Sequence, residues 1–156
     1  MGRVGSYRSL HANSPCSLLQ PIVMGKSYRE LFIWQESVSV AVEIVALTDA
    51  LPRPKPYALI DQMQRAAISV PSNIAEGKGR LSEKELRRFL GMARGSLFEL
   101  HTQLEISRKL NLVEQATYQC LIIRLRKIGS GINNMIRNLN TSIAQQLNSY
   151  SPRHDS

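Results

Sequence analysis

Four segments with apolar residues at helical spacing constrain this chain more than any other feature. They run from about Tyr28 to Leu51, Tyr57 to Gly77, Glu83 to Leu110 and Glu114 to Leu147, with short breaks between them. None shows the strict alternation of polar and apolar residues that is typical of a half-buried strand. Short connections make consecutive helices antiparallel neighbours. We therefore predict an all-α domain, an antiparallel up-down four-helix bundle.

Prolines mark the end of the first helix and a weak point inside the second. Pro52, Pro54 and Pro56 follow the first segment in a cluster that cannot continue a helix. Pro71 lies within the second segment, where it removes one backbone hydrogen bond and its ring clashes with the preceding turn. We predict a kink near Ala67, with a break into two shorter helices as the alternative.

The turn between the second and third helices carries signals for both helix ends. Ser82 is followed three residues later by Glu85, which is the spacing of a capping box at the start of a helix. Gly77 and Gly79 suit the end of the preceding helix, where a left-handed residue is commonly required. These signals explain the turn without a ligand.

The third and fourth helices each carry one apolar stripe that suits a bundle core. The predicted core positions are Leu86, Phe89, Leu90, Ala93, Leu97, Leu100 and Leu104, and then Leu121, Leu125, Ile128, Ile132, Ile136 and Leu139. We assign residues 28–147 to one four-helix bundle domain, because 156 residues with 43% hydrophobic content suit a single core. Residues 1–27 are predicted to be a flexible N-terminal extension, and residues 148–156 a disordered C-terminal tail.

The first helix has more apolar surface than a monomeric bundle uses. One face carries Leu31, Trp34, Val38, Val42 and Val45. The opposite face and the outer side of the third helix carry the residues that we predict to form a subunit interface: Ile33, Val40, Ile44, Leu47, Gly91, Gly95 and Phe98. Paired small residues such as the two glycines let another backbone approach closely. These second faces favour self-association over a monomer with an apolar surface.

The chain is basic, with 20 Lys and Arg against 12 Asp and Glu and a formal charge of +8. Residues 115–154 contain no acidic residue. From the charge distribution we predict phosphate contacts by Lys84, Arg87 and Arg88 on the third helix and by Arg124, Arg126, Lys127 and Arg137 on the fourth. Few aromatic residues lie near this stripe, so contacts to the nucleic-acid backbone are favoured over base stacking. A solvated face, an acidic protein partner and an anionic membrane remain alternatives.

Other classes of function find no support in the sequence. No apolar run approaches the ~18 residues that span a bilayer, and the N-terminus lacks the apolar stretch of a secretory signal. Cys16 and Cys120 lie far apart with no Cys or His at metal-ligand spacing, so we expect a reducing cytoplasm and no metal site. Glu99 and His101 point to different faces of their helix and Glu105 lies on its flank, which does not suit a di-metal centre. We expect no cofactor, no catalytic residue and no enzymatic activity.

Three stretches of the chain resemble a known family. They are YRELFIWQ at residues 28–35, QMQRAAISVPSNIAEG at residues 62–77 and RFLGMARGSLFELHTQL at residues 88–104. Together they are similar to the small four-helix bundle proteins encoded by intervening sequences in bacterial 23S ribosomal RNA genes. The same broad family includes the accessory variability protein of diversity-generating retroelements. The resemblance covers about residues 28–139, and the middle stretch is the most specific.

The resemblance implies a ring-shaped homopentamer that binds RNA or DNA through a positively charged surface. In the retroelement branch, it implies a ring that contacts a reverse transcriptase and supports complementary DNA synthesis without being an enzyme. It also implies phosphate contacts by basic residues in or beside the matching stretches: Arg65, Lys78, Arg80, Arg87 and Arg88. His101 stands where relatives often carry an acid, and residues 1–23 have no counterpart, so the motifs leave the branch open.

Overall fold

The computed structural model describes residues 27–51 and 56–149, with side chains described as far as residue 145. Its elements are a short 3-10 helix, η1 (Tyr28–Glu30), followed by α1 (Phe32–Asp49), α2 (Tyr57–Gly79), α3 (Glu83–Lys109) and α4 (Gln115–Ser149). No strand occurs in these ranges, so the predicted all-α four-helix bundle is confirmed. The predictions for the N-terminal extension up to residue 26, for Pro52 and Pro54, and for the tail from residue 150 lie outside the described residues.

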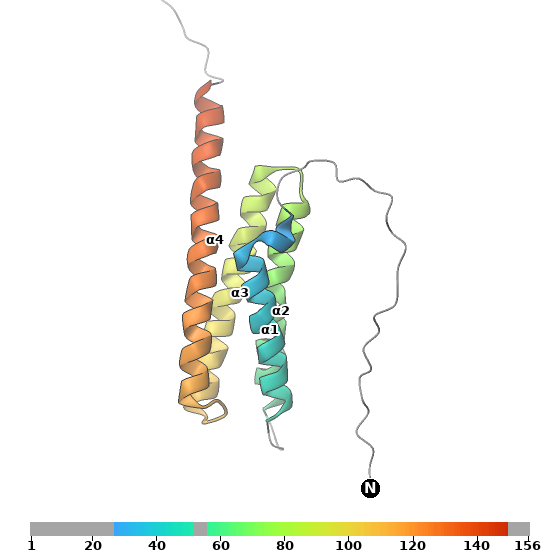
Figure 1. Cartoon of the computed structure of the whole chain (residues 1–156), viewed down its shortest axis with the longest axis vertical. Helices are drawn as coiled ribbons and strands as arrows, with labels where there is room; N and C mark the ends of the chain where they lie inside the picture. The colour runs from blue at the N-terminus through green and yellow to red at the C-terminus, as the bar shows by residue number, and fades with distance from the viewer. Residues whose placement is uncertain (1–26, 52–55, 150–156) are drawn as a thin grey trace, which may run out of the picture.

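The four helices form a closed cycle in which each packs against two others (Figure 1). The contacts join α1 to α2, α2 to α3, α3 to α4 and α4 back to α1. Between α2 and α3, Ser69 meets Ser96, with 2.9 Å between their hydroxyl oxygens, while Met63 meets Ser107, so these two helices run in opposite directions. As a result, the α1–α2 edge of the bundle lies opposite the α3–α4 edge. At its C-terminal end α4 extends past the other helices (Figure 1).

The core lies between the four helices, and both predicted stripes point into it. The predicted positions on α3 from Phe89 to Leu104 are buried, as are those on α4 from Leu121 to Ile132. Leu86, Ile136 and Leu139 are half-buried and pack against the edge of the core. The helical period of the apolar residues therefore placed the core-facing side of these two helices correctly.

The first helix begins later than predicted. Residues Tyr28–Glu30 form a single 3-10 turn, in which the Ser27 hydroxyl accepts a hydrogen bond from the Arg29 backbone N–H. Leu31 then adopts an extended conformation with φ −73° and ψ 122°, and α1 starts at Phe32. The predicted start at Tyr28 was wrong because helical spacing of apolar residues cannot distinguish a continuous helix from a turn followed by a helix.

α2 is continuous through Pro71, which is buried. The alternative of two shorter helices was therefore wrong. A single Pro removes one hydrogen bond of the helical ladder, and the buried residues on both sides of it, Val70 and Ile74, hold the helix against the core. The predicted kink near Ala67 stays a prediction.

The turn between α2 and α3 differs from both local predictions. No glycine in the described residues has a positive φ, so neither Gly77 nor Gly79 is a left-handed cap. Gly77 is instead buried, and an added Cβ there would lie 2.9 Å from the Cβ of Phe89, so this glycine is needed for close packing of α2 on α3. Ser82 occupies the N-cap position but its side chain forms no capping bond. The Glu85 carboxylate accepts from Arg88 at 3.2 Å, so the capping box is absent.

Candidate functional site

A basic groove runs along the α3–α4 edge of the bundle, and we call it the α3–α4 groove. It consists of three adjoining hollows with volumes of about 460, 360 and 430 Å³, and Arg94 lines all three. Its polar and charged lining residues are Lys84, Glu85, Arg87, Arg88, Arg94 and His101 from α3, and Arg126, Ser130, Asn133, Asn134, Arg137 and Asn140 from α4. Long basic side chains from both helices therefore face one continuous depression.

Four of the groove arginines have no carboxylate partner among the described residues: Arg87, Arg94, Arg126 and Arg137. Arg94 instead donates to the Asn133 side-chain oxygen at 3.3 Å, and Arg137 donates to that of Asn134. An amide orients a guanidinium without neutralising it, so the groove keeps its positive charge and stays suited to an anion.

Three predicted basic residues form ion pairs with carboxylates, two of them near the α2–α3 turn and one on α2. Arg80 forms an ion pair with Glu76, and Arg88 forms one with Glu85. Both guanidinium groups also lie over the ring of Phe89, at 5.3 and 4.6 Å from its centroid. Arg65, on α2, pairs with Asp61, whose hydrogen bond and charge raise the pKa of this arginine. It is exposed but does not line the groove.

Four further predicted lysine and arginine positions are exposed. Lys84 and Arg87 line the α3–α4 groove, whereas Lys78 is exposed near the end of α2. Lys127 lines a neighbouring hollow together with Phe32 and Ile123, next to Arg126. The positive surface thus includes Lys84 and Arg87 inside the groove and Lys127 beside it. Lys78 lies near the end of the groove that is next to the α2–α3 turn.

Arg124 does not belong to this surface. It reaches from α4 to α1, where it forms ion pairs with Glu36 and Glu43 and donates to the Ser39 hydroxyl at 2.8 Å. Burial lowers the pKa of Arg124, but the hydrogen bonds and charges of the two glutamates outweigh this effect and raise it. These ion pairs argue against the predicted phosphate contact at Arg124, because its charge is already balanced by two carboxylates of a neighbouring helix.

Arg94 is the main groove residue that the sequence prediction left out. It lies one helical turn after Gly91, which also lines the groove, and an added Cβ at Gly91 would meet no atom within 4 Å. The signal was present in the spacing of Arg87 and Arg94, seven residues apart and therefore on one side of a helix. The basic and amide-rich face of α4 can be read from the sequence, but its position opposite these arginines is a result of helix packing.

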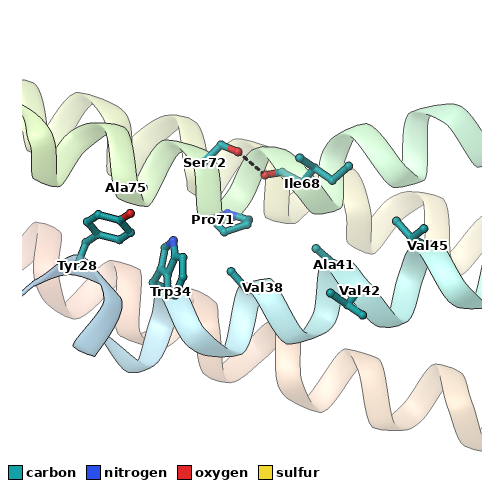
Figure 2. A pocket seen from close by; sticks show the side chains of 10 residues that line it. All are labelled: Tyr28, Trp34, Val38, Ala41, Val42, Val45, Ile68, Pro71, Ser72 and Ala75. Atoms are coloured by element: carbon teal, nitrogen blue, oxygen red, sulfur yellow. Dashed lines mark hydrogen bonds between the residues drawn. The ribbon is translucent and has the colours of Figure 1, made fainter. Parts of the chain in front are cut away.

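A second, apolar groove lies at the α1–α2 edge, and we call it the α1–α2 groove (Figure 2). It has a volume of about 460 Å³ and is lined by Tyr28, Trp34, Val38, Ala41, Val42, Val45, Ile68, Pro71, Ser72 and Ala75. Val42 is 65% exposed and Ile68 is 52% exposed. The Tyr28 ring meets the Trp34 ring edge to face at 5.2 Å, which fixes one end of the groove.

The structure reverses the two faces of α1. Ile33, Val40 and Ile44, which were predicted to form a subunit interface, are 5%, 1% and 0% exposed within the single chain and belong to its core. Leu47 is half-buried and packs against the same core. A Cβ at Gly131 would lie 2.3 Å from Ile33 Cγ2, so this glycine of α4 is what allows Ile33 to enter. The spare apolar face is therefore the one that carries Trp34, Val38 and Val42.

The predicted interface positions on α3 are at the surface. Gly91 is half-buried in the α3–α4 groove, Gly95 is exposed, and Phe98 is 61% exposed. A role for them in association stays a prediction.

An ion-pair cluster joins α3 to α4 near the turn between them. Arg108 donates to both oxygens of Glu105, at 3.0 and 2.6 Å, and lies over the Tyr118 ring at 5.2 Å. The hydrogen bonds from Arg108 and Tyr118 lower the pKa of Glu105 to about 2. The hydrogen bond to Glu105 and burial raise the pKa of Tyr118. This cluster fixes the α3–α4 pair at one end.

Within the described ranges, no three His, Cys, Asp or Glu side chains gather where they could hold a metal ion. Cys120 is exposed and unpaired. The described helices include none that is both long and apolar enough to cross a membrane.

Comparisons with known proteins agree with the fold. A crystal structure of a protein of unknown function from the S23 ribosomal protein family, from Bacteroides thetaiotaomicron, is 21% identical to the chain, with a TM-score of 0.63. The match covers 67% of this chain and 97% of that one, and at this identity it supports the fold alone. No curated protein matches the chain. The model of one family, described as 23S rRNA-intervening sequence protein, matches residues 29–134. The chain therefore belongs to the family of 23S rRNA-intervening sequence proteins.

Proposed function

We propose that this protein is a non-enzymatic, cytoplasmic nucleic-acid-binding protein and that the α3–α4 groove holds the phosphate backbone. The observation that carries the proposal is the convergence of Arg94, Arg126 and Arg137 without carboxylate partners among the described residues. Guanidinium groups match phosphate oxygens with paired hydrogen bonds. Asparagine side chains beside them can donate to phosphate and sugar oxygens as well.

The energetics of such a groove depend on counterions. Each phosphate that a cationic side chain neutralises releases condensed counterions, so the logarithm of the binding constant falls with the logarithm of salt by about 0.9 per phosphate on duplex DNA and about 0.7 on a single strand. The groove residues come from two helices and line a continuous depression, which favours contact with several phosphates at once. The family description mentions 23S rRNA, which makes structured RNA the first substrate to test, with DNA beside it.

The test is a salt series with a charge reversal in the groove. Binding of a structured RNA and of a DNA duplex is measured by fluorescence anisotropy between about 50 and 200 mM salt. We expect affinity to fall steeply with salt, and the double variant Arg126→Glu with Arg137→Glu to lose most of the binding and flatten the salt slope. Arg65→Glu is the matched control, because Arg65 is exposed but lies outside the groove. No binding at low salt, or equal affinity of the double variant and the control, would contradict the proposal.

We further propose that subunits associate through the α1–α2 groove, as the ring-shaped homopentamer that the family resemblance implies. This groove exposes Val42 and Ile68 in one patch with Trp34, and burial of apolar surface stabilises association by about 25 cal/mol per Å² before the costs of ordering. The α3–α4 groove lies at the opposite edge of the bundle, so a subunit seated in the α1–α2 groove does not itself cover it. A ring would therefore present several basic grooves to one polyanion, which raises the overall affinity.

A second candidate function is a scaffold that docks a reverse transcriptase and supports complementary DNA synthesis. The apolar character of the α1–α2 groove favours this candidate, because a groove without charged lining residues suits a protein surface better than a nucleic acid. Co-purification with a reverse transcriptase encoded nearby, together with sedimentation of the isolated chain, separates the two candidates. A lone protomer that is captured by the enzyme would favour the scaffold. A ring that binds RNA without the enzyme would favour the first proposal.

A further inference from the structure

One part of the α3–α4 groove differs in chemistry from the rest. This hollow of about 360 Å³ has Phe98 and His101 on one side, Gly129 and Ser130 on the other, and Leu97 and Leu125 among its lining residues. Arg94, Arg126 and Asn133 complete its lining. We propose that this hollow holds one unpaired nucleobase, so that the protein prefers single-stranded or looped nucleic acid over a continuous duplex. The inference rests on the proposed function and specifies its substrate class.

The apolar part of the hollow is suited to a flat ring. Leu97 and Leu125 are buried residues of the core and form an apolar lining. Gly129 adds no side chain, and a Cβ there would lie 3.0 Å from Leu97 Cδ2. Gly129 therefore lets the Leu97 side chain pack directly against the α4 backbone, and the two together form the apolar floor of the hollow.

Phe98, which the sequence predicted at a subunit interface, provides a surface on which a base can stack. It is 61% exposed and lies three residues before His101 on the same side of α3, so the two rings face the same hollow. Every base has a π-face, and stacking on an aromatic side chain therefore stabilises binding without a sequence requirement. The sequence predicts few aromatic residues near the basic residues of α4. In the folded chain, Phe98 of α3 lies in the same hollow as Arg126 of α4.

Polar groups surround this apolar lining. Asn133 accepts from Arg94 through its side-chain oxygen, and the described residues provide no partner for its amide nitrogen. The Ser130 hydroxyl likewise forms no hydrogen bond to a described residue. These groups can meet the edge of a base, while Arg94 and Arg126 at the same hollow can hold phosphates next to it. A base inside a duplex is stacked and paired, so only an unpaired base can enter.

The experiment compares strands that differ only in their bases. A 12-nucleotide single-stranded RNA, a fully abasic strand of the same length and a duplex of the same sequence are bound to the full chain at fixed salt. We expect the intact single strand to bind roughly 5- to 150-fold more tightly than the abasic strand, which is the range for stacking of one base on an aromatic side chain. We also expect it to bind more tightly than the duplex.

Variants at Phe98 tie the effect to this hollow. Phe98→Ala should remove the difference between intact and abasic strands, while Phe98→Trp should retain it. The fold is expected to tolerate both variants because the side chain is mostly exposed. Equal affinity for intact and abasic strands, or a duplex that binds as tightly as the single strand, would overturn the inference and leave the proposed function standing. A Phe98→Ala chain that sediments as a smaller assembly would assign this residue to a subunit interface and overturn it too. Absence of binding to all three ligands would overturn both proposals.

Discussion

The two grooves of this bundle have opposite chemistry. The α1–α2 groove and the largest hollow of the α3–α4 groove have the same volume, about 460 Å³. The first is lined by Trp34 and by valines such as Val38 and Val42, and contains no charged residue. The lining of the second includes three arginines and one lysine against a single carboxylate, Glu85. A four-helix bundle needs one apolar stripe on each helix for its core, and the remaining faces are free to differ. The fold thus separates an apolar surface from a cationic one.

The difference also predicts opposite responses to salt. Attraction between the cationic groove and phosphates weakens as salt rises, because added counterions compete with the protein. Association through apolar surface does not weaken in this way, and salts that are excluded from the protein surface strengthen it. A salt series that follows oligomer size and nucleic-acid binding together therefore tests whether the two grooves serve separate tasks.

The largest expected effect is the loss of the assembly when the apolar groove receives a charge. We expect Val42→Glu to convert the proposed ring into protomers in sedimentation velocity, because a carboxylate would be buried without a partner in each interface. The helix content should be unchanged, since Val42 is 65% exposed in the single chain. Ala46→Glu is the control, because Ala46 is exposed on the same helix but outside the groove. If Val42→Glu sediments like the unchanged protein, the α1–α2 groove is not the interface.

The next largest effect is expected at Arg94, in the opposite groove. Arg94→Glu places a negative charge where three hollows meet, so we expect RNA affinity at low salt to fall roughly 10- to 100-fold and the salt slope to decrease by about one. Sedimentation should show the same assembly as before the substitution. The measurement is anisotropy at several salt concentrations. A uniform few-fold loss, equal to that of Arg65→Glu, would show that only the net charge matters and not the groove.

The sequence predicted the fold well where one helix face is apolar and the others are not. The stripes of α3 and α4 satisfy this condition, and Leu90, Leu104 and Ile132 are buried as expected. On α1 two faces are apolar. The spacing of the apolar residues defines both faces but does not show which of them packs against the other helices. The answer lies in the contact between Ile33 and Gly131, which are 98 positions apart in the sequence. Pairing of this kind is a property of the packed helices and has no local signal.

The candidate site was predicted less completely for a similar reason. A charge count shows that Arg124 and Arg126 are both basic, but it does not show that Glu36 and Glu43 of α1 reach only the first of them. Conversely, Arg94 gains its importance from the amide groups of α4 across the groove. Local sequence therefore identified a basic stripe, while the partners of each cation depended on tertiary structure.

A third prediction separates two arginines that are two residues apart. Arg124→Ala leaves Glu36 and Glu43 without their partner, and we expect it to reduce the free energy of unfolding by about 1–3 kcal/mol in urea denaturation. Arg126→Ala should leave stability unchanged but weaken RNA binding, because Arg126 is exposed in the groove. The opposite pattern, with binding lost at Arg124 alone, would restore the original prediction from sequence.

A fourth prediction concerns two glycines with different surroundings. Gly91→Ala should raise the free energy of unfolding by about 0.5–1 kcal/mol, because alanine favours a helix and the added Cβ enters open space. Gly77→Ala should lower it, since its Cβ would lie 2.9 Å from the Cβ of Phe89. Both values come from urea denaturation. If Gly91→Ala destabilises the chain, the floor of the basic groove is more tightly packed than the contacts indicate.

The smallest effect is expected at the ion-pair cluster that joins α3 to α4 beyond the basic groove. Because the pKa of Glu105 is lowered from 4.5 to about 2, its ionised form stabilises the fold fully above pH 4.5, and this contribution is lost as the pH falls toward 2. Glu105→Gln should therefore be less stable than the unchanged protein at pH 7, and the gap between them should close between pH 4.5 and 2. Urea denaturation at a series of pH values measures the gap. Arg108→Gln should reproduce it, since Arg108 is the main partner of Glu105. Parallel stability curves for Glu105→Gln and the unchanged protein would show that the pair contributes nothing at this end of the groove, so that apolar packing alone holds α3 against α4 there.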